Sequence, residues 1–495
     1  MLSRPTQRGF SGINKQIAVL CNSSSSDVLA GRIMNRLSDI SGVSDFHYVG
    51  YGGQNMKEAG LETSEIDVDQ FMDKGFYTFR KTKLMEEAQN QRFSSLNWIN
   101  QHFRRNTNDI LSDVDHVSFM RKLYRSRPSV VLNFDNEYAT FNMMDEFSKY
   151  YKNNTVARPQ RHFLGRFVKD FRQWDLKSID YMHYSIPMLT ALPDGFRFPS
   201  QYMGQYGTYD ALRHIFENDA QSEHLIGENK IRLSKRHFAA ETEAVVERRR
   251  AQFRQAHSIS DDSTVVFFNP GNSAEEVEFS FESVRRGMKE FLLKYSAPTS
   301  LSPIAKPLDK FHTIISLQSG SAGEDKFNEL IKDAEWFGEY TVVSDSNNEH
   351  YEAMAASDLG ISYDGQMVSA AAALHLPTMV LLKMRMHHQW YHDLFNRWAN
   401  NMNLIADKDI YPELIGGQAW FGKITNTLGE WYLKPRTRYA KIEQFEGFVK
   451  ESLPRADNVQ PASTQFGEIS FDNESAYDEF VDPIQITAEK IWQDI

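Results

Sequence analysis

Residues 17–27 read IAVLCNSSSSD, and this stretch decides the fold class of the chain. The first five residues are continuously apolar, which is typical of a strand covered on both faces, as the strands of parallel sheets are. A polar turn follows, and residues 28–37 have the pattern of a helix. The stretch therefore predicts a strand, a short connection and a helix, the repeating unit of α/β folds.

The same strand-then-helix pattern recurs along the chain. Three apolar runs precede residue 200, five follow residue 260, and a polar, mostly helical stretch over residues 209–257 connects the two groups. Such alternation predicts an α/β protein with two Rossmann-like, doubly wound parallel sheets. The predicted strands are 17–21, 46–50, 129–134, 264–268, 311–317, 340–344, 358–362 and 378–382.

The composition excludes several classes of protein. A net charge of −11 argues against nucleic-acid binding, which needs a positive surface. One cysteine, Cys21, excludes an intramolecular disulfide and a multi-cysteine metal site. No stretch approaches the about 18–20 consecutive apolar residues of a transmembrane helix. The basic run Arg248-Arg249-Arg250 is interpreted as a solvated face of a helix around residues 235–257.

The first 26 residues contain Arg4, Arg8 and Lys15 but no acidic residue. This is the composition of a mitochondrial transit peptide, and Arg8-Gly9-Phe10-Ser11 resembles the processing signals of that class. We expect residues 1–15 to be a mitochondrial targeting segment, and the protein to lie in the matrix or at the inner membrane.

Three segments are interpreted as additions to the fold, and one of them, residues 296–308, is read as a loop because it carries three prolines and three serines. Residues 90–125 are polar and predict a helical insertion in the first domain. Residues 456–489 contain no lysine or arginine, while six acids fall between Glu468 and Asp482. Such an acidic tail is typical of a disordered segment or of an arm that docks on a partner, and the sequence leaves both open.

Nine motifs, in order from residue 17 to residue 414, resemble those of lipid-A-disaccharide synthases. One example is Asn269-Pro270-Gly271-Asn272-Ser273-Ala274-Glu275-Glu276-Val277, which looks like Leu-Pro-Gly-Ser-Arg-x-x-Glu-Val. The others are Ser25-Ser26-Asp27, residues 52–56, Met72 with Gly75, residues 127–135, His183-Tyr184, Ala356-Ser357-Asp358 leading to Gly365, residues 376–380 and residues 403–414.

The resemblance implies the GT-B architecture, in which two Rossmann-like domains face a cleft. Enzymes of this family join UDP-diacylglucosamine to a diacylglucosamine phosphate and release UDP without a metal ion. The implied organisation is an acceptor-side domain over residues 16–215, a nucleotide-sugar-side domain over 216–440, and a C-terminal helix and acidic tail over 441–495.

The resemblance also places the site residues. Asp135 matches the family's first acid after its strand, which makes it the candidate catalytic base, surviving or vestigial, although a helix cap explains it equally well. Asp27, Asn403 and Glu413 have structural explanations as well. The nucleotide-sugar-binding positions, in degenerate form, are Ser25, Ser26, Asp27, Gly271, Ser273, Gly365, Gln366, Asn403 and Glu413.

Several donor-binding positions depart from the family pattern. Serines replace the glycines of the opening motif, although glycine alone lets a ligand approach the backbone closely. Ser273 stands where the family has an arginine, so the bidentate fork for phosphate is lost. Asp364 stands where the family has a small hydroxyl, and Ala370 replaces the glutamate that binds the ribose.

We therefore expect a non-catalytic accessory or scaffold subunit of a mitochondrial assembly, with protein partners and without a cofactor, a metal ion or nucleic acid. A UDP-sugar or a lipid is a further candidate ligand. The alternative is an active, divergent glycosyltransferase that moves a lipid-linked glucosamine from UDP to a lipid acceptor.

Overall fold

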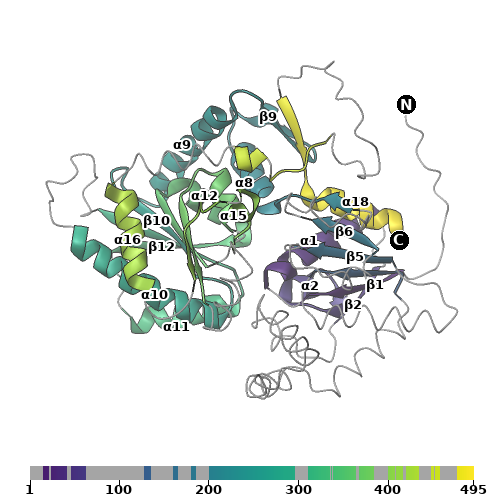
Figure 1. Cartoon of the computed structure of the whole chain (residues 1–495), viewed down its shortest axis with the longest axis horizontal. Helices are drawn as coiled ribbons and strands as arrows, with labels where there is room; N and C mark the ends of the chain where they lie inside the picture. The colour runs from purple at the N-terminus through teal and green to yellow at the C-terminus, as the bar shows by residue number, and fades with distance from the viewer. Residues whose placement is uncertain are drawn as a thin grey trace, which may run out of the picture. The chain divides into compact units, whose positions relative to one another are not determined.

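The fold was analysed on a computed structural model of the whole chain (Figure 1). The structure describes residues 15–21, 24–41, 46–62, 128–134, 160–165, 180–184, 200–295, 310–334, 336, 338–363, 367–383, 398, 400–406, 408–415, 420–433, 447–450, 452–456 and 477–495. The predicted insertion at 90–125 lies outside these ranges, as do the first 14 residues of the predicted targeting segment.

The chain divides into two compact units. The first contains Met1–Gly165, Asp170–His183 and Thr487–Ile495, and the second contains Arg166–Lys169 and Tyr184–Ile486. The predicted domain boundary between residues 215 and 216 falls inside helix α8 (Tyr206–Glu217), whose apolar face packs in the core of the second unit. The division thus comes near residue 184.

The first sheet has seven strands in the order β3-β2-β1-β4-β5-β6-β7. The three strands predicted in this part of the chain are confirmed as β1, β2 and β4, and β1 pairs in parallel with both of the others. Helix α1 (Ser24–Ser41) follows β1 and buries Ile33, Met34 and Leu37 completely. The strands are β1 (Lys15–Leu20), β2 (Phe46–Tyr51), β3 (Leu61–Glu62), β4 (Val130–Asn133), β5 (Gln160–Gly165), β6 (Tyr181–Tyr184) and β7 (Ser200–Tyr202).

The second sheet has six parallel strands in the order β12-β11-β10-β13-β14-β15. All five strands predicted after residue 260 are present, so the doubly wound architecture is confirmed. They are β10 (Thr264–Asn269), β11 (Phe311–Leu317), β12 (Glu339–Ser344), β13 (Leu359–Ser362) and β14 (Thr378–Leu382), and β15 (Glu413–Ile415) joins them.

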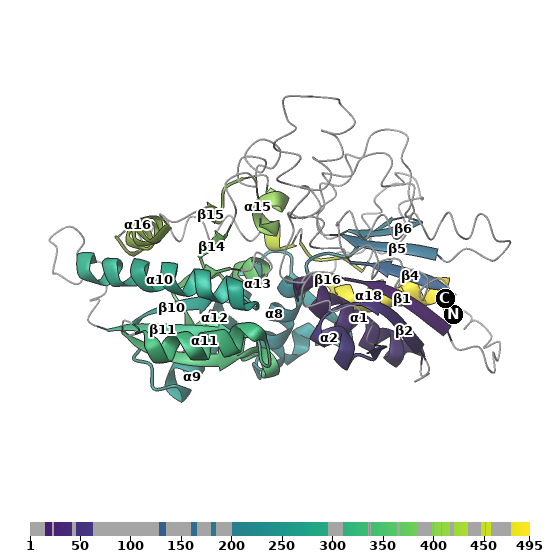
Figure 2. The ribbon, with the colours of Figure 1, turned by 90° about the horizontal axis from the view of Figure 1, so that it is seen from below.

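Helices cover both faces of the second sheet, as continuous apolar strands require. One core contains side chains of α10 (Ala274–Tyr295), α11 (Ala322–Asp333) and α16 (Trp420–Leu433). The other contains side chains of α8, α9 (Phe238–Ala256), α12 (Glu349–Ala356), α13 (Met367–Ala373) and α15 (Asn401–Ala406). In Figure 2, α10 and α16 lie on one side of β10 and β11, and α9 lies on the other.

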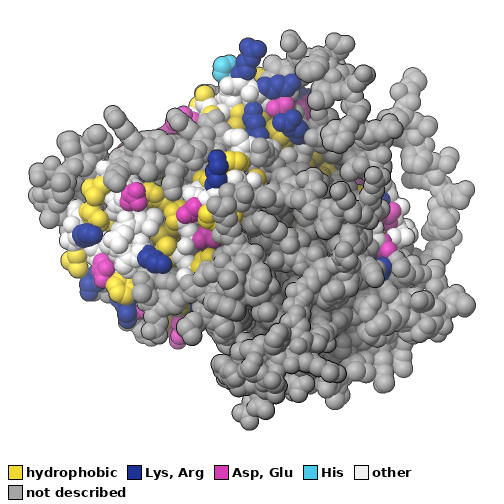
Figure 3. All heavy atoms as spheres, viewed as in Figure 1, with side chains coloured by type: hydrophobic (Ala, Val, Ile, Leu, Met, Phe, Trp, Pro, Cys, Tyr) yellow, Lys and Arg dark blue, Asp and Glu magenta, His cyan; other side chains and the backbone are white. Residues whose placement is uncertain are grey.

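The stretch 209–257, predicted as mostly helical, is helical in α8 and α9 but not in its middle part. Strands β8 (Ile226–Gly227) and β9 (Lys230–Ser234) form a hairpin there, and β16 (Tyr477–Val481) pairs antiparallel with β9. Glu479 accepts hydrogen bonds from Lys230 at 2.8 Å and from Arg232 at 2.9 Å. Figure 3 shows lysine and arginine side chains over this part of the unit, with acidic side chains among them. Part of the acidic tail therefore pairs with its own chain.

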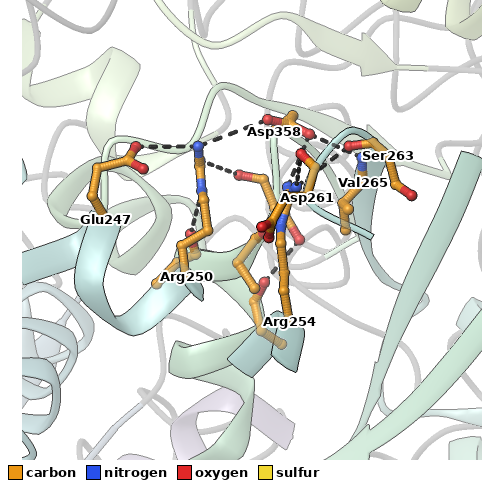
Figure 4. Close-up of polar contacts among 11 residues, drawn as sticks. Glu247, Arg250, Arg254, Asp261, Ser263, Val265 and Asp358 are labelled. Atoms are coloured by element: carbon orange, nitrogen blue, oxygen red, sulfur yellow. Dashed lines mark hydrogen bonds and ion pairs between the residues drawn. The ribbon is translucent and has the colours of Figure 1, made fainter. Parts of the chain in front are cut away.

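The arginines of α9 are not a solvated face, and this corrects the sequence interpretation. Arg254 is 2% exposed; it donates to the Ala356 carbonyl at 2.9 Å and to Asp358 Oδ2 at 3.1 Å (Figure 4). Arg250 donates to the carbonyls of Ala355 and Ser357. Guanidinium groups at the C-terminus of α12 satisfy carbonyls that the helix itself leaves unpaired. Arg250 and Arg254 thus fasten α9 to the end of α12 and to the start of β13.

The helices that the structure describes include none with the length and apolar character of a membrane span. Helix α18 (Pro483–Asp494) ends the chain. Its last residues pack in the first unit, where Trp492 meets Phe46 edge-on at 5.8 Å between ring centroids.

Candidate functional site

The second sheet changes direction between β10 and β13. From β10 the chain continues to β11 and β12 on one side, whereas β13, β14 and β15 lie on the other. The ends of the two strands are neighbours, because Asn269 pairs with Ser362. Open α/β sheets bind ligands beside such a switch point, at the carboxyl ends of the strands. Gly271 and Ser273 lie in the loop that follows β10, whereas Gly365 and Gln366 lie outside the described residues.

Gly271 is required by the packing of this loop. Its φ is +106°, a conformation that L side chains rarely adopt, and a Cβ there would lie 2.6 Å from the Cβ of Glu276. Its N–H donates to Asn269 Oδ1 at 3.2 Å. The glycine therefore has a reason to persist that does not depend on a ligand.

Ser273 and Glu276 form a capping box at the start of α10. Glu276 Oε2 accepts from the backbone N–H groups of Asn272 at 3.0 Å and Ser273 at 3.1 Å, and the Glu276 N–H donates to Ser273 Oγ at 3.3 Å. Free N–H groups at a helix N-terminus are the usual site for a phosphate. Here a carboxylate of the same chain accepts from two of them.

Helix α11 begins in the same way. The Glu324 N–H donates to Ser321 Oγ at 3.1 Å, and Glu324 Oε2 accepts from the Gly320 N–H at 2.7 Å. After β12, Asp345 Oδ1 accepts from the Ser319 N–H at 2.9 Å, and burial raises the pKa of Asp345 above its ordinary value. Carboxylates thus line the carboxyl ends of β10, β11 and β12, and their negative potential opposes the approach of an anion.

A lysine that the sequence interpretation did not single out lies at the same edge. Lys383 follows β14 directly; its Nζ lies 2.8 Å from Glu275 Oε1 and 5.4 Å from the centre of the Phe279 ring. Both charged side chains are substantially exposed, so the pair contributes at most about 1 kcal/mol. A cation directly after a predicted strand is the signal that could have identified it.

Ala370, at the position of the family's ribose-binding glutamate, is 1% exposed in helix α13. It belongs to the apolar core that also contains Tyr209 and Leu212 of α8. The neighbouring Ser369 carbonyl accepts from Thr208 Oγ1 at 3.3 Å, which fastens α13 to α8. A carboxylate at position 370 would have to enter this apolar packing.

Asn403 and Glu413 hold a loop together. The Oδ1 of Asn403 accepts from the N–H groups of Ile410 and Tyr411 at 2.9 Å each, and its Nδ2 donates to the Tyr411 carbonyl at 2.8 Å. Glu413 Oε1 accepts from Asn400 N–H at 2.8 Å. These bonds join α15 to β15.

In the first unit, Asp27 is an internal cap. Its carboxylate accepts from the N–H groups of Gly53 at 2.7 Å, Asn55 at 2.9 Å and Met56 at 3.2 Å, at the start of α2 (Gln54–Glu58). Asp27 is 2% exposed and Ser26 is 5% exposed. Two family-like motifs that are distant in sequence therefore meet through one carboxylate. The side chain of Ser25 and the candidate base Asp135 lie outside the described part of the chain.

His183, from the family-like His-Tyr pair, lies in β6 beside His162 of β5. His162 Nδ1 and His183 Nε2 are 3.1 Å apart, and both side chains are fully buried. Burial lowers the pKa of His162 to about 4, while Asp494, whose Oδ2 lies 3.4 Å from His162 Nε2, opposes the shift. Burial, with His162 adding to it, lowers the pKa of His183 well below its ordinary value. Both imidazoles are therefore neutral at pH 7.

Within the ranges that the structure describes, no group of three or more His, Cys, Asp or Glu side chains could hold a metal ion. Cys21 directly follows β1 and is buried, as a small apolar side chain is.

No known protein-family model matches the chain. It is 22% identical over 333 residues to the lipid-A-disaccharide synthase of Hydrogenovibrio crunogenus, a match that covers 66% of this chain and 74% of the other.

Solved structures of low sequence identity match most of the chain. They include the UDP-GlcNAc 2-epimerase of Neisseria meningitidis bound to UDP-GlcNAc (11% identity, 88% of this chain and 97% of that one, TM-score 0.41) and MurG of Acinetobacter baumannii (9%, 88% and 95%, 0.44). A third is the spinosyn rhamnosyltransferase SpnG complexed with thymidine diphosphate (10%, 88% and 96%, 0.45). The two parallel sheets, the order of the motifs and the similarity to the Hydrogenovibrio crunogenus synthase agree: the chain is a lipid-A-disaccharide-synthase-like protein of the GT-B type.

Proposed function

We propose that this chain is a non-catalytic lipid-A-disaccharide-synthase-like protein that serves as an accessory or scaffold subunit of a mitochondrial assembly. The observation that carries the proposal is a division among the family-like positions. Those that are retained and described have partners inside the fold, whereas those that would contact the sugar nucleotide have changed.

The retained positions illustrate the first half of this division. Asp27 caps α2, Gly271 accommodates Glu276, and Asn403 organises the loop before β15. Each of these contacts would be selected for folding alone. Their persistence therefore says nothing in favour of catalysis.

The changed positions illustrate the second half. Ser273 supplies neither the charge nor the fork of an arginine, and the loss of one such preorganised donor costs about 10²–10³ in rate. Ala370 lies in an apolar core, and Glu276, Glu324 and Asp345 make the nearby strand ends negative. A leaving diphosphate would meet carboxylates where it needs positive charge.

Calorimetric titration of the full chain with UDP, and separately with UDP-N-acetylglucosamine, tests the proposal. We expect no binding heat and no change in melting temperature, with the Hydrogenovibrio crunogenus synthase as a positive control. Stoichiometric binding of UDP would contradict the proposal. Ser273→Arg should not create binding, because Glu276 still accepts from the N–H groups of the loop.

Turnover of a UDP-sugar would favour the alternative, an active glycosyltransferase. The Asp135→Asn variant then identifies the base: it should abolish turnover and leave the melting temperature within about 1 °C of the parent. Unchanged turnover in that variant would exclude Asp135 as the base.

Import of the full chain into isolated mitochondria tests the compartment. We expect import that depends on membrane potential, and its loss when Arg4 and Arg8 are both changed to glutamate, because such segments need positive charge. Fractionation of a mitochondrial extract then tests the scaffold role. Elution of the endogenous chain only at its own mass, or as a simple homo-oligomer, would count against an assembly.

A further inference from the structure

Strand β12 is an edge of the second sheet. It pairs with β11 along its whole length, from His312↔Glu339 to Leu317↔Ser344, and it ends the order of the strands that the structure describes there. The backbone N–H and C=O groups of its outer side therefore have no neighbouring strand among the residues that the structure describes. Such an edge accepts another strand readily unless the protein protects it.

The strand's own sequence carries little of the usual protection. Its sequence, Glu339-Tyr340-Thr341-Val342-Val343-Ser344, contains no lysine, proline or glycine, and one charge at its first residue. Aromatic and β-branched residues of this kind favour strand pairing.

The edge also presents apolar side chains to solvent. Tyr340 is 44% exposed and Val342 is 45% exposed, whereas Val343 is 2% exposed. Alternate residues of a strand share a face, so Tyr340 and Val342 project on the same side of the sheet. With Leu293 of α10, at 70%, they are the exposed large hydrophobic residues of the part of the chain that the structure describes.

The strand is complementary to itself in one antiparallel register. The two-fold axis is perpendicular to the sheet and lies midway between the Thr341 residues of the two copies. It keeps each face of the sheet on its own side. Tyr340 of one copy then lies opposite Val342 of the other, and the same pair occurs twice. Aromatic and β-branched side chains opposite one another are a favourable cross-strand pair.

Other registers fit less well. A shift by one residue reverses the faces of the added strand. A register centred on Val342 pairs that residue with itself and places Tyr340 opposite Ser344. In the register centred on Thr341, Glu339 lies opposite Val343, so no like charges face each other.

We propose that β12 is a homodimerisation edge, at which two copies of this chain pair antiparallel about Thr341 and join two six-stranded sheets into one. The proposal does not depend on whether the protein is catalytic. One strand buries less surface than the about 800 Å² per partner of a standard interface, so the dimer should be weak and concentration-dependent.

Sedimentation velocity of the full chain at about 1 to 100 µM tests the association. We expect a monomer–dimer equilibrium, and a dissociation constant at least about tenfold higher for Val342→Lys, which places a charge opposite Tyr340. Leu293→Lys is the matched control, because it makes the same chemical change on α10, and it should not alter the equilibrium. A chain that stays monomeric throughout, or equal effects of the two variants, would overturn the proposal.

Cysteine cross-linking tests the register without burying a charge. Residues directly opposite in an antiparallel pair have Cβ atoms close enough for a disulfide. Thr341→Cys should therefore form a dimer on mild oxidation, whereas Val342→Cys should not, and the buried Cys21 gives a low background. Cross-linking through Val342→Cys alone, or through neither variant, would overturn the pairing about Thr341.

Discussion

Asp27 Oδ2 accepts two hydrogen bonds from Asn55, one from its backbone N–H and one from its Nδ2, each at 2.9 Å. The contact joins the start of α1 to the start of α2 across 28 positions of sequence. Asp27 resembles part of a sugar-nucleotide motif in sequence, but in the structure it stabilises the start of α2.

Asp27→Asn should destabilise the protein by about 1–3 kcal/mol, because buried N–H groups lose a charged acceptor. Equilibrium denaturation in urea measures the free energy of unfolding. Asp39→Asn is the control: Asp39 is 68% exposed in a 3.7 Å pair with Arg36, and its change should cost less than about 0.5 kcal/mol. An equal loss in the free energy of unfolding for the two variants would show that the Asp27 cap stabilises the protein no more than an exposed ion pair does.

Asp358→Asn should cost about 3–5 kcal/mol, since it leaves the buried Arg254 without its anionic partner. Asp358 Oδ2 also accepts from the Val265 N–H at 3.0 Å, so the start of β10 loses a bond as well. Glu282→Gln, which removes the acid shared by Arg285 and Arg286 on α10, is the matched control and should cost less than about 1 kcal/mol. Thermal unfolding followed by circular dichroism separates these outcomes.

Ala370→Glu should destabilise the second unit, and the loss should be larger at pH 8 than at pH 5. Burial raises the pKa of a carboxyl group, so the folded state binds the proton more tightly than the unfolded state does. Stability is then retained below the unfolded pKa and lost as the pH rises through the folded one. Ala370→Ser, without a titratable group, is the control, and denaturation at both pH values is the measurement. A variant as stable at pH 8 as its parent would mean that position 370 reaches solvent.

Acid should weaken the first unit through its two buried histidines. In the folded state the pKa of His162 falls to about 4, below the ordinary value of 6.5, so the unfolded chain binds more protons in this range. The free energy of unfolding is therefore highest above about pH 6.5. It decreases as the pH falls toward 4, by about 2 kcal/mol for His162 at pH 5.

Free energies of unfolding at pH 7.5, 6 and 5 measure this loss. His162→Gln should flatten the pH dependence, because the group that titrates on unfolding is removed. An unchanged slope in His162→Gln would assign the acid sensitivity to other groups.

The sequence by itself determined eight strands of the two sheets, namely β1, β2, β4 and β10 to β14. The five apolar residues 17–21 and the four apolar residues 265–268 are local signals, because strands buried on both faces are typically continuous apolar runs. The capping box Ser273-Ala274-Glu275-Glu276 is local as well, since its bonds span one helical turn.

Only the tertiary structure decided the roles of the polar residues. Strands β5 and β6 read QRHFLG and YMHY, which are not apolar runs, and they form because His162 and Arg161 find partners in His183 and Asp180. Arg254 resembles a surface residue until Asp358, 104 positions away, is placed beside it. A buried polar group is stable only with a partner, and a partner distant in sequence is fixed by packing rather than by local pattern.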